Sequence, residues 1–379
     1  MATQKSPDAA FGYRLGLQLA PIVVVCALVF LVPVFLDNDF LLNKFARYVV
    51  FGILAMSLSL SWGYAGILNL GQAMSFGLGS YALAMALKLK TVPIQTGSSG
   101  LPDFMAWNNV ETLPWFWVPF QSLGFALFAG VAIPAAVAAA LGWFMFRGRV
   151  TGVYVAIITL ATMVVINLVI IDQQRYTGGF NGLTDLAQLE IFGISFDAYS
   201  RSTYYLVACS LTATLLIAFA FTKSRAGLII QAIRDHESRV RYFGYDVAVY
   251  QIFSFALSAA IAGLAGMLYT VVMEFASPTF LGVQLSLSVV VWCAVGGRQS
   301  LVGAFLGAVL VAGMQGALSE SAAFLETWTL VMGGLFILVV IFLPTGLAGL
   351  AQTIGARVGR REGTRAHAAE PLESTEGRL

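Results

Sequence analysis

The long apolar stretches of this chain have no charged side chain in their interiors. Both histidines, His236 and His367, fall in hydrophilic segments, and the 19 acidic residues fall in loops, tails or the ends of the stretches. A charge at mid-bilayer costs about 2.5–3.5 kcal/mol on insertion scales, and proton-coupled pumps keep carboxylates or histidines there as relays. The absence argues against a proton relay. It indicates a passage for a neutral polar solute, driven by energy from elsewhere.

Other chemical motifs are missing too. The three cysteines, Cys26, Cys209 and Cys293, are dispersed among apolar runs, which fits buried thiols better than a metal site. The chain lacks a G-x-x-x-x-G-K-[ST] phosphate loop, so any nucleotide chemistry belongs to another polypeptide. No nucleophile, base or metal-ligand cluster reaches membrane depth, which argues against a membrane enzyme.

Apolar residues dominate the chain. Of its 379 residues 59% are hydrophobic and 11% are charged, whereas a soluble domain has about 25% charged residues. A crossing helix needs about 20 apolar residues, and the composition predicts an all-α polytopic membrane protein. The candidate spans are 16–36, 46–63, 67–88, 121–146, 152–171, 203–222, 250–273, 284–296, 302–319 and 324–343. Because 46–63, 67–88 and 284–296 are short or interrupted by glycine, we expect eight to ten crossings, with some broken or short helices.

The lysine and arginine residues predict the orientation. With ten spans and the N-terminus inside, 15 of the 21 fall in cytoplasmic segments. The six on the outside are Lys44, Arg47, Lys88, Lys90, Arg175 and Arg201. This bias follows the positive-inside rule and places both termini in the cytoplasm. We expect a cytoplasmic N-terminus at 1–15, a membrane domain at 16–350 with outside loops at 89–120 and 172–202, and a disordered basic tail at 351–379.

A cytoplasmic loop at 223–249 contains a charged amphipathic segment. Its spacing predicts a helix at 232–243, in which Glu237 and Arg241 pair one turn apart. Gly244 follows the helix, and glycine ends helices well because it tolerates the left-handed conformation.

The same segment has an apolar stripe of Ile233, Val240 and Phe243. Two interpretations of its polar face are open: a solvated loop that follows the positive-inside rule, or a docking surface for a cytoplasmic partner. The missing nucleotide motif favours docking. The candidate ATPase-coupling residues are Arg234, Asp235, Glu237, Ser238, Arg239 and Gly244.

A glycine-rich polar segment at 63–81 indicates an interrupted helix whose freed backbone groups face protein or water. Its two amides, Asn69 and Gln72, each offer a donor and an acceptor without charge, which suits a neutral amide-like solute. Hydrogen bonding across helices is the alternative explanation. The candidate residues of a solute path are Asn69, Gln72, Asn181 and Thr184.

Small residues recur at four-residue spacing in two of the later runs. Ser258, Ala262 and Gly266 share one helical face, as do Gly303 and Gly307. Such faces predict closely packed membrane helices, because small side chains let backbones approach.

Four segments together resemble the permeases of branched-chain-amino-acid-type ABC importers, specifically the LivM-like subfamily. They are Gly63-Tyr64-Ala65-Gly66, Asn181-Gly182-Leu183-Thr184, Ala232-Ile233-Arg234-Asp235-His236-Glu237 and Gly296-Gly297-Arg298. The outside segment with Leu101-Pro102-Asp103-Phe104-Met105 and Leu113-Pro114-Trp115-Phe116-Trp117 is similar to an insertion in the permeases of urea ABC importers. The resemblance covers roughly residues 45 to 350.

The resemblance implies an assembly and a location. Residues 232–244 correspond to a coupling loop that seats in a cleft of the ATPase. The partners would be a second homologous permease, two cytoplasmic ATPase subunits that bind ATP and Mg, and a periplasmic substrate-binding protein. The chain itself would be a multi-pass protein of the bacterial inner membrane, with no cofactor, metal or nucleic acid of its own. One residue departs from the family pattern, since Gln72 stands where relatives usually have histidine.

Three functions are compatible with these features. The leading interpretation is an importer permease for urea or a short amide. The same fold for branched-chain amino acids is the main alternative, since helix ends can supply dipoles to a zwitterion. A stand-alone facilitative channel is a third interpretation, and it would need no docking loop. Deletion of 223–249 should abolish transport by the importer and spare transport by the channel.

Overall fold

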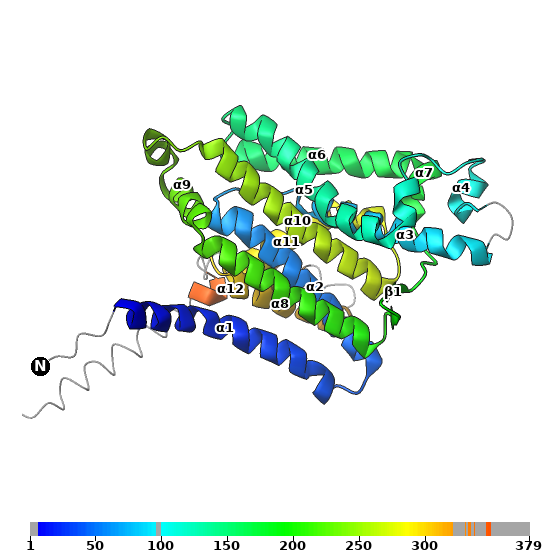
Figure 1. Ribbon diagram of the computed structural model, residues 1–379, viewed down its shortest axis with the longest axis horizontal. Helices are drawn as coiled ribbons and strands as arrows, with labels where there is room; N and C mark the ends of the chain where they lie inside the picture. Colours follow the sequence, from blue (N-terminus) through cyan, green and yellow to red (C-terminus); the bar gives the residue numbers. More distant parts are fainter. Residues whose placement is uncertain are drawn as a thin grey trace, which may run out of the picture.

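A computed structural model describes residues 7–95 and 100–320, together with 330, 333–334, 337 and 346–349. Long helices run side by side and define two ends of the molecule (Figure 1). The long elements are α1 (Pro7–Phe35), α2 (Asp39–Ser59) with the π-helical turn η1 (Leu60–Tyr64), α3 (Gln72–Gln95), α5 (Leu123–Arg147), α6 (Val153–Asp172), α8 (Arg201–Lys223), α9 (Arg225–Tyr242), α10 (Val247–Met273), α11 (Val283–Gly296) and α12 (Leu301–Glu320).

Short elements gather at the end opposite α9 (Figure 1). They are α4 (Asp103–Trp107), η2 (Val118–Gln121), α7 (Gln174–Thr177), η3 (Gly179–Asn181), the hairpin β1 (Leu189–Ile191) and β2 (Ile194–Phe196), and η4 (Pro278–Leu281). The two strands pair antiparallel, with Glu190 opposite Ser195. The sequence predicted only an outside loop at 172–202, and it did not predict the hairpin or α7 there.

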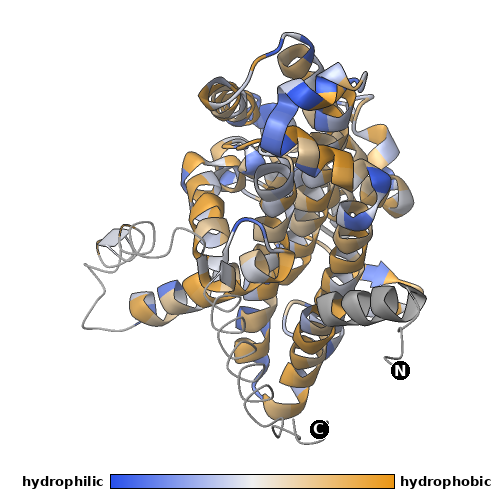
Figure 2. Ribbon diagram, turned by 90° about the vertical axis from the view of Figure 1, so that its left-hand side faces the viewer, coloured by the Kyte–Doolittle hydropathy of each residue, from blue (hydrophilic) through white to orange (hydrophobic). Residues whose placement is uncertain are grey.

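The helical membrane class is confirmed. Six helices of the described chain are long and apolar enough to cross a membrane, and two shorter apolar helices lie at Leu19–Phe35 and Val283–Gly296. Hydrophobic residues make up much of the long helices (Figure 2). Large apolar side chains stand exposed along this surface, which suits contact with lipid; examples are Phe128, Ile157, Val165, Leu168, Ile217 and Leu310. The candidate span 324–343 and the tail 351–379 lie outside the described residues, apart from isolated positions of the former.

The helices are longer than the apolar runs that predicted them. α2 begins at Asp39 rather than at 46, and α3 continues to Gln95. As a result Lys44, Arg47 and Lys88 lie within helices rather than in loops. The interiors of the apolar stretches contain no charge, as the sequence indicated, but the helices that include them carry these three cations nearer their ends.

α10 lies at the centre and packs against α2, α3 and α5. Small residues make this packing possible, as predicted: a Cβ on Gly266 would collide with the Phe76 carbonyl oxygen of α3. Gly307 of α12 likewise approaches the Trp292 carbonyl oxygen of α11. Close backbone contact replaces the hydrophobic driving force that lipid cannot provide.

Candidate functional site

α9 lies at one end of the molecule and is longer than the sequence predicted. It begins at Arg225, where the Ser224 hydroxyl caps it by accepting the Gly227 N–H at 3.1 Å. The expected single helix at 232–243 is wrong, because His236 has φ −152° and ψ 80°, which interrupts the helical path. The candidate coupling residues therefore lie on both sides of a bend.

One side of α9 is built into the fold. Ile230, Ile233 and Val240 are 1%, 3% and 8% exposed. The predicted stripe is wrong for Phe243, which is 81% exposed. Two other predictions are confirmed. Arg241 donates to Glu237 at 2.6 Å, and Gly244 has φ +86°, the left-handed conformation that ends the helix.

The remaining candidate coupling residues divide by exposure. Asp235, Ser238, Arg239 and Gly244 are exposed, whereas Arg234 is partly buried. α9 thus presents a polar face to its surroundings while its apolar face holds it to the membrane domain. Contact of this face with an ATPase stays a prediction.

Arg234 joins α9 to η1 and to the turn that follows it. Its Nη1 donates to the Gly63 carbonyl oxygen at 2.7 Å, and its guanidinium pairs with Asp235 at 2.9 Å. Gly66 packs against the stem of the Arg234 side chain with φ +75°, a conformation that strains any residue with a Cβ. Gly66, Arg234 and Glu237 help to line a cavity of about 160 Å³ beside this contact.

A third segment, which contains Arg298, contacts the same region. A Cβ on Gly63 would collide with the Arg298 carbonyl oxygen, and that oxygen accepts the Ser59 hydroxyl at 2.8 Å. The Arg298 guanidinium lies 5.7 Å from the centre of the Trp62 ring. Three of the four segments singled out in the sequence therefore meet at one place, which we call the inner junction: 59–66, Arg234 and Arg298.

The two amides of the interrupted segment bond to each other just beyond this junction. Asn69 Nδ2 donates to Gln72 Oε1 at 2.6 Å, and Gln72 Nε2 donates to the hydroxyls of Ser57 at 2.7 Å and Ser258 at 3.1 Å. Asn69 Oδ1 accepts the Gly71 N–H at 2.9 Å. The network joins α2, α3 and α10, so hydrogen bonding across helices is confirmed.

Both amides are enclosed. Asn69 is 2% exposed and Gln72 is fully buried, and each makes hydrogen bonds within the protein. The interrupted helix itself is confirmed: η1 ends at Tyr64 and α3 begins at Gln72. A role for these amides in solute passage stays a prediction.

The other two solute-path candidates lie at the opposite end. Lys88 is 16 residues after Gln72 on α3, or roughly 24 Å at 1.5 Å per residue; its Nζ donates to the Thr184 carbonyl oxygen at 2.9 Å. Asn181 and Thr184 are both exposed. The structure therefore brings Asn69 to Gln72 but separates this pair from Asn181 and Thr184.

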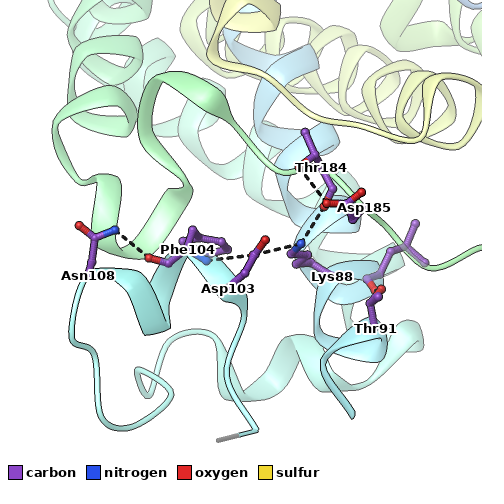
Figure 3. A network of polar contacts seen from close by, with 8 residues as sticks. Lys88, Thr91, Asp103, Phe104, Asn108, Thr184 and Asp185 are labelled. Atoms are coloured by element: carbon purple, nitrogen blue, oxygen red, sulfur yellow. Dashed lines mark hydrogen bonds and ion pairs between the residues drawn. The ribbon is translucent and has the colours of Figure 1, made fainter. Parts of the chain in front are cut away.

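Lys88 is the residue that sequence analysis missed. It is only 1% exposed, and its Nζ lies 3.0 Å from Asp103 Oδ1 as well as 2.9 Å from the Thr184 oxygen (Figure 3). The contacts tie α3 to α4 and to the segment after η3. The same segment also pairs with Ala276, because Leu183 and Ala276 make two backbone hydrogen bonds of 2.8 and 2.9 Å. No spacing in the sequence links Lys88 to Asp103, so only the fold reveals the pair.

Comparisons with known proteins find similar transport permeases. The high-affinity branched-chain amino acid transport system permease protein LivM of Salmonella typhimurium is 25% identical over 326 residues, which are 80% of this chain and 69% of the relative. LivM of Escherichia coli is similar to the same extent. The ribose import permease protein RbsC of Haemophilus influenzae is 23% identical and covers 79% of this chain and 84% of its own.

No solved structure matches the chain. Residues 40–340 match a family described as branched-chain amino acid transport system / permease component. This match includes the inner junction, the buried amides and the Lys88 contacts. The chain therefore belongs to the family of permease components of branched-chain amino acid transport systems.

Proposed function

We propose that this chain is a permease subunit of an ATP-driven importer in the inner membrane of a bacterium, and that its solute is a branched-chain or similar apolar amino acid. The observation that carries the proposal is the Arg234 contact with Gly63. It connects a helix with an exposed polar face to the turn that leads into the buried amides of α3. The names of the LivM relatives support the class of solute.

The coupling would pass from α9 through Arg234 to the central helices. An ATPase bound to the exposed face of α9 would move Arg234, whose side chain holds the Gly63 carbonyl oxygen and packs on Gly66. The segment 67–71 then connects this turn to Gln72, which bonds Ser57 of α2 and Ser258 of α10. Movement of α9 would thus shift the packing of central helices.

The assembly needs further subunits. A second homologous permease would complete the path, two cytoplasmic ATPase subunits would bind ATP and Mg, and a periplasmic protein would deliver the solute. The exposed apolar side chains of α5, α6 and α8 would face lipid or the second permease. Neither catalysis nor a cofactor is assigned to this chain.

Cysteine crosslinking tests the docking of α9. Ser238 is exposed and has no hydrogen bond within the described residues, so Ser238→Cys should crosslink to an ATPase subunit without disturbing the fold. Arg234→Ala should lower transport-coupled ATP hydrolysis, because it removes the contact with Gly63. Arg225→Ala is the matched control, since Arg225 is exposed on the same helix and makes no ion pair there.

Equal ATP hydrolysis in the Arg234→Ala and Arg225→Ala importers would contradict the proposed coupling. A channel would also give that result, since it has no ATPase to couple. Deletion of 223–249 distinguishes the two less sharply than the sequence suggested. It would also remove Ile230 and Ile233 from the apolar core.

Urea is a second candidate solute, favoured by one observation. The outer segment that resembles the insertion of urea permeases is an ordered part of the fold, with Leu101 4% exposed and Asp103 paired to Lys88. Parallel uptake of labelled leucine and labelled urea by the reconstituted importer, with and without ATP, decides between the two. ATP-dependent uptake of urea alone would replace the amino-acid assignment.

A further inference from the structure

Arg47 is a cation inside a membrane helix. It follows Asp39, the first residue of α2, by eight positions, or roughly 12 Å at 1.5 Å per residue. A charged residue at that depth is disfavoured unless function or a partner keeps it there. Lys44, one turn earlier, has such a partner, because its Nζ lies 2.6 Å from Glu320 of α12.

Arg47 has no such partner. Within the described part of the chain its guanidinium makes no hydrogen bond and no ion pair, and its Nε is shielded from solvent without an acceptor. The side chain as a whole is partly exposed, so the outer nitrogens remain accessible. The two outer nitrogens of the guanidinium are therefore free to bind an anion end-on.

The surroundings of Arg47 are aromatic. Phe51, one turn further along α2, stacks on Tyr269 of α10 with ring centres 5.2 Å apart, and lies 4.8 Å from the ring of Trp292 on α11. The Tyr269 phenol lies within electrostatic range of the Arg47 charge. Phe280 extends the cluster through an edge contact with Tyr269 at 5.0 Å.

Trp292 adds a second unused donor to the cluster. The residue is 3% exposed, and its indole Nε1 has no hydrogen-bond partner among the described residues. Arginine and the indole N–H can only donate hydrogen bonds. Both groups therefore need a hydrogen-bond acceptor. Buried donors left without acceptors are uncommon in folded proteins and call for a ligand or another explanation.

We propose that Arg47 binds the carboxylate of an amino acid during passage, while Phe51, Tyr269 and Trp292 contact its apolar side chain. The inference rests on the proposed function and names the group that the path recognises. A carboxylate supplies two acceptors in the geometry of the guanidinium edge, and such bidentate pairs are short and charge-assisted. Urea is neutral and brings one carbonyl acceptor with four N–H donors, so it fits a donor-only site poorly.

Binding by the full chain in lipid nanodiscs tests the assignment directly. The probes are leucine, leucinamide, which keeps the side chain but lacks the carboxylate, and urea. Wild-type protein should bind leucine roughly 10–100-fold more tightly than leucinamide, the range that a charge-assisted hydrogen bond gives. Arg47→Gln should bind leucine as weakly as leucinamide. Arg47→Lys keeps the charge but loses the paired N–H donors of the guanidinium. Its affinity for leucine should lie between those of wild type and Arg47→Gln.

Arg175→Gln is the matched control, because it removes an exposed arginine near the same end of the molecule and should leave binding unchanged. Trp292→Phe shrinks a ring that contacts the apolar side chain, which both probes share, so it should weaken the binding of leucine and of leucinamide by a similar factor. Equal binding of leucine and leucinamide by the wild-type chain would overturn the inference without any variant.

Uptake by the reconstituted importer separates this inference from the proposed function. Leucine uptake that is unaffected by Arg47→Gln would overturn the inference and leave the proposed function standing. An importer that moves no leucine, although the chain binds leucine through Arg47, would overturn the proposed function and keep the inference.

Discussion

Two cations near the end opposite α9 show how partners decide the role of a charge within a long helix. Lys88 is almost fully buried and satisfied, because Asp103 and the Thr184 carbonyl oxygen both accept from its ammonium group. Arg47 is partly exposed and has neither kind of partner in the described chain. Lys88 therefore stabilises the fold, whereas Arg47 is available to bind a ligand.

The Lys88 contacts should matter for stability. Lys88→Met leaves Asp103 without its partner, and breaking a buried ion pair in this way costs about 3–5 kcal/mol. Lys90→Met is the control, because Lys90 is exposed two residues further along α3. Thermal unfolding of the detergent-solubilised protein should show a clear loss for Lys88→Met and little change for Lys90→Met.

The double variant Lys88→Met with Asp103→Leu sharpens the same test. Replacing both partners by apolar residues removes the uncompensated charge, so stability should recover part of the loss. Equal unfolding temperatures for the two lysine variants would show that the Lys88 pair adds no stability.

At the scale of elements, the break between η1 and α3 is the feature that organises the inner half. A π-helical turn ends α2, seven residues without regular helix follow, and α3 starts with a buried glutamine. Mid-helix π turns are rare and are often found at functional sites. Here the turn brings Gly63 against the carbonyl of Arg298 and within reach of Arg234.

Gly63 should tolerate no larger residue. Gly63→Ala puts a methyl group where the Arg298 carbonyl oxygen lies, and rigid backbone surrounds the collision. We expect displacement of the turn at 297–300 and a loss of transport-coupled ATP hydrolysis. Gly124→Ala is the control, since a Cβ there meets nothing closer than the Ser122 hydroxyl at 3.9 Å. Both should be compared for folded yield by size-exclusion chromatography.

A Gly63→Ala importer with wild-type coupling would contradict the inner junction as a mechanical contact. A variant that does not fold would locate the defect in packing instead. In that case Arg234→Ala, which adds no bulk, carries the test of coupling.

At the scale of the whole molecule, charge separates the two ends. The end with α9 carries most of the exposed arginines of the described chain: Arg147, Arg149, Arg225, Arg239, Arg241 and Arg298. The opposite end carries α4, α7 and the hairpin (Figure 1). The positive-inside rule predicts that the α9 end faces the cytoplasm.

Labelling of single cysteines in intact cells tests this orientation. Ser195→Cys, on the exposed second strand of the hairpin, should react with an impermeant maleimide from outside. Ser238→Cys on α9 should react only after the membrane is opened. The unsubstituted chain gives the background from its own thiols, of which Cys209 is exposed. Labelling of Ser238→Cys from outside would reverse the assigned orientation.

The sequence alone determined the helical membrane class, the position of the apolar runs and the small-residue faces. These features depend on composition and on the spacing of residues over a few helical turns. They are therefore local to each helix and do not need the tertiary structure. The Glu237–Arg241 pair and the left-handed Gly244 were predictable for the same reason. Helix ends were less predictable, because α2 extends past its apolar run to the charged residues at 39–44.

Only the tertiary structure decided which of these residues act together. Arg234 and Gly63 are 171 positions apart, and Ser59 and Arg298 are 239 apart. No local periodicity encodes such contacts, because they arise when separate helices pack and their turns meet. The same holds for Arg47, whose lack of a partner within the described residues depends on which side chains the fold packs around it.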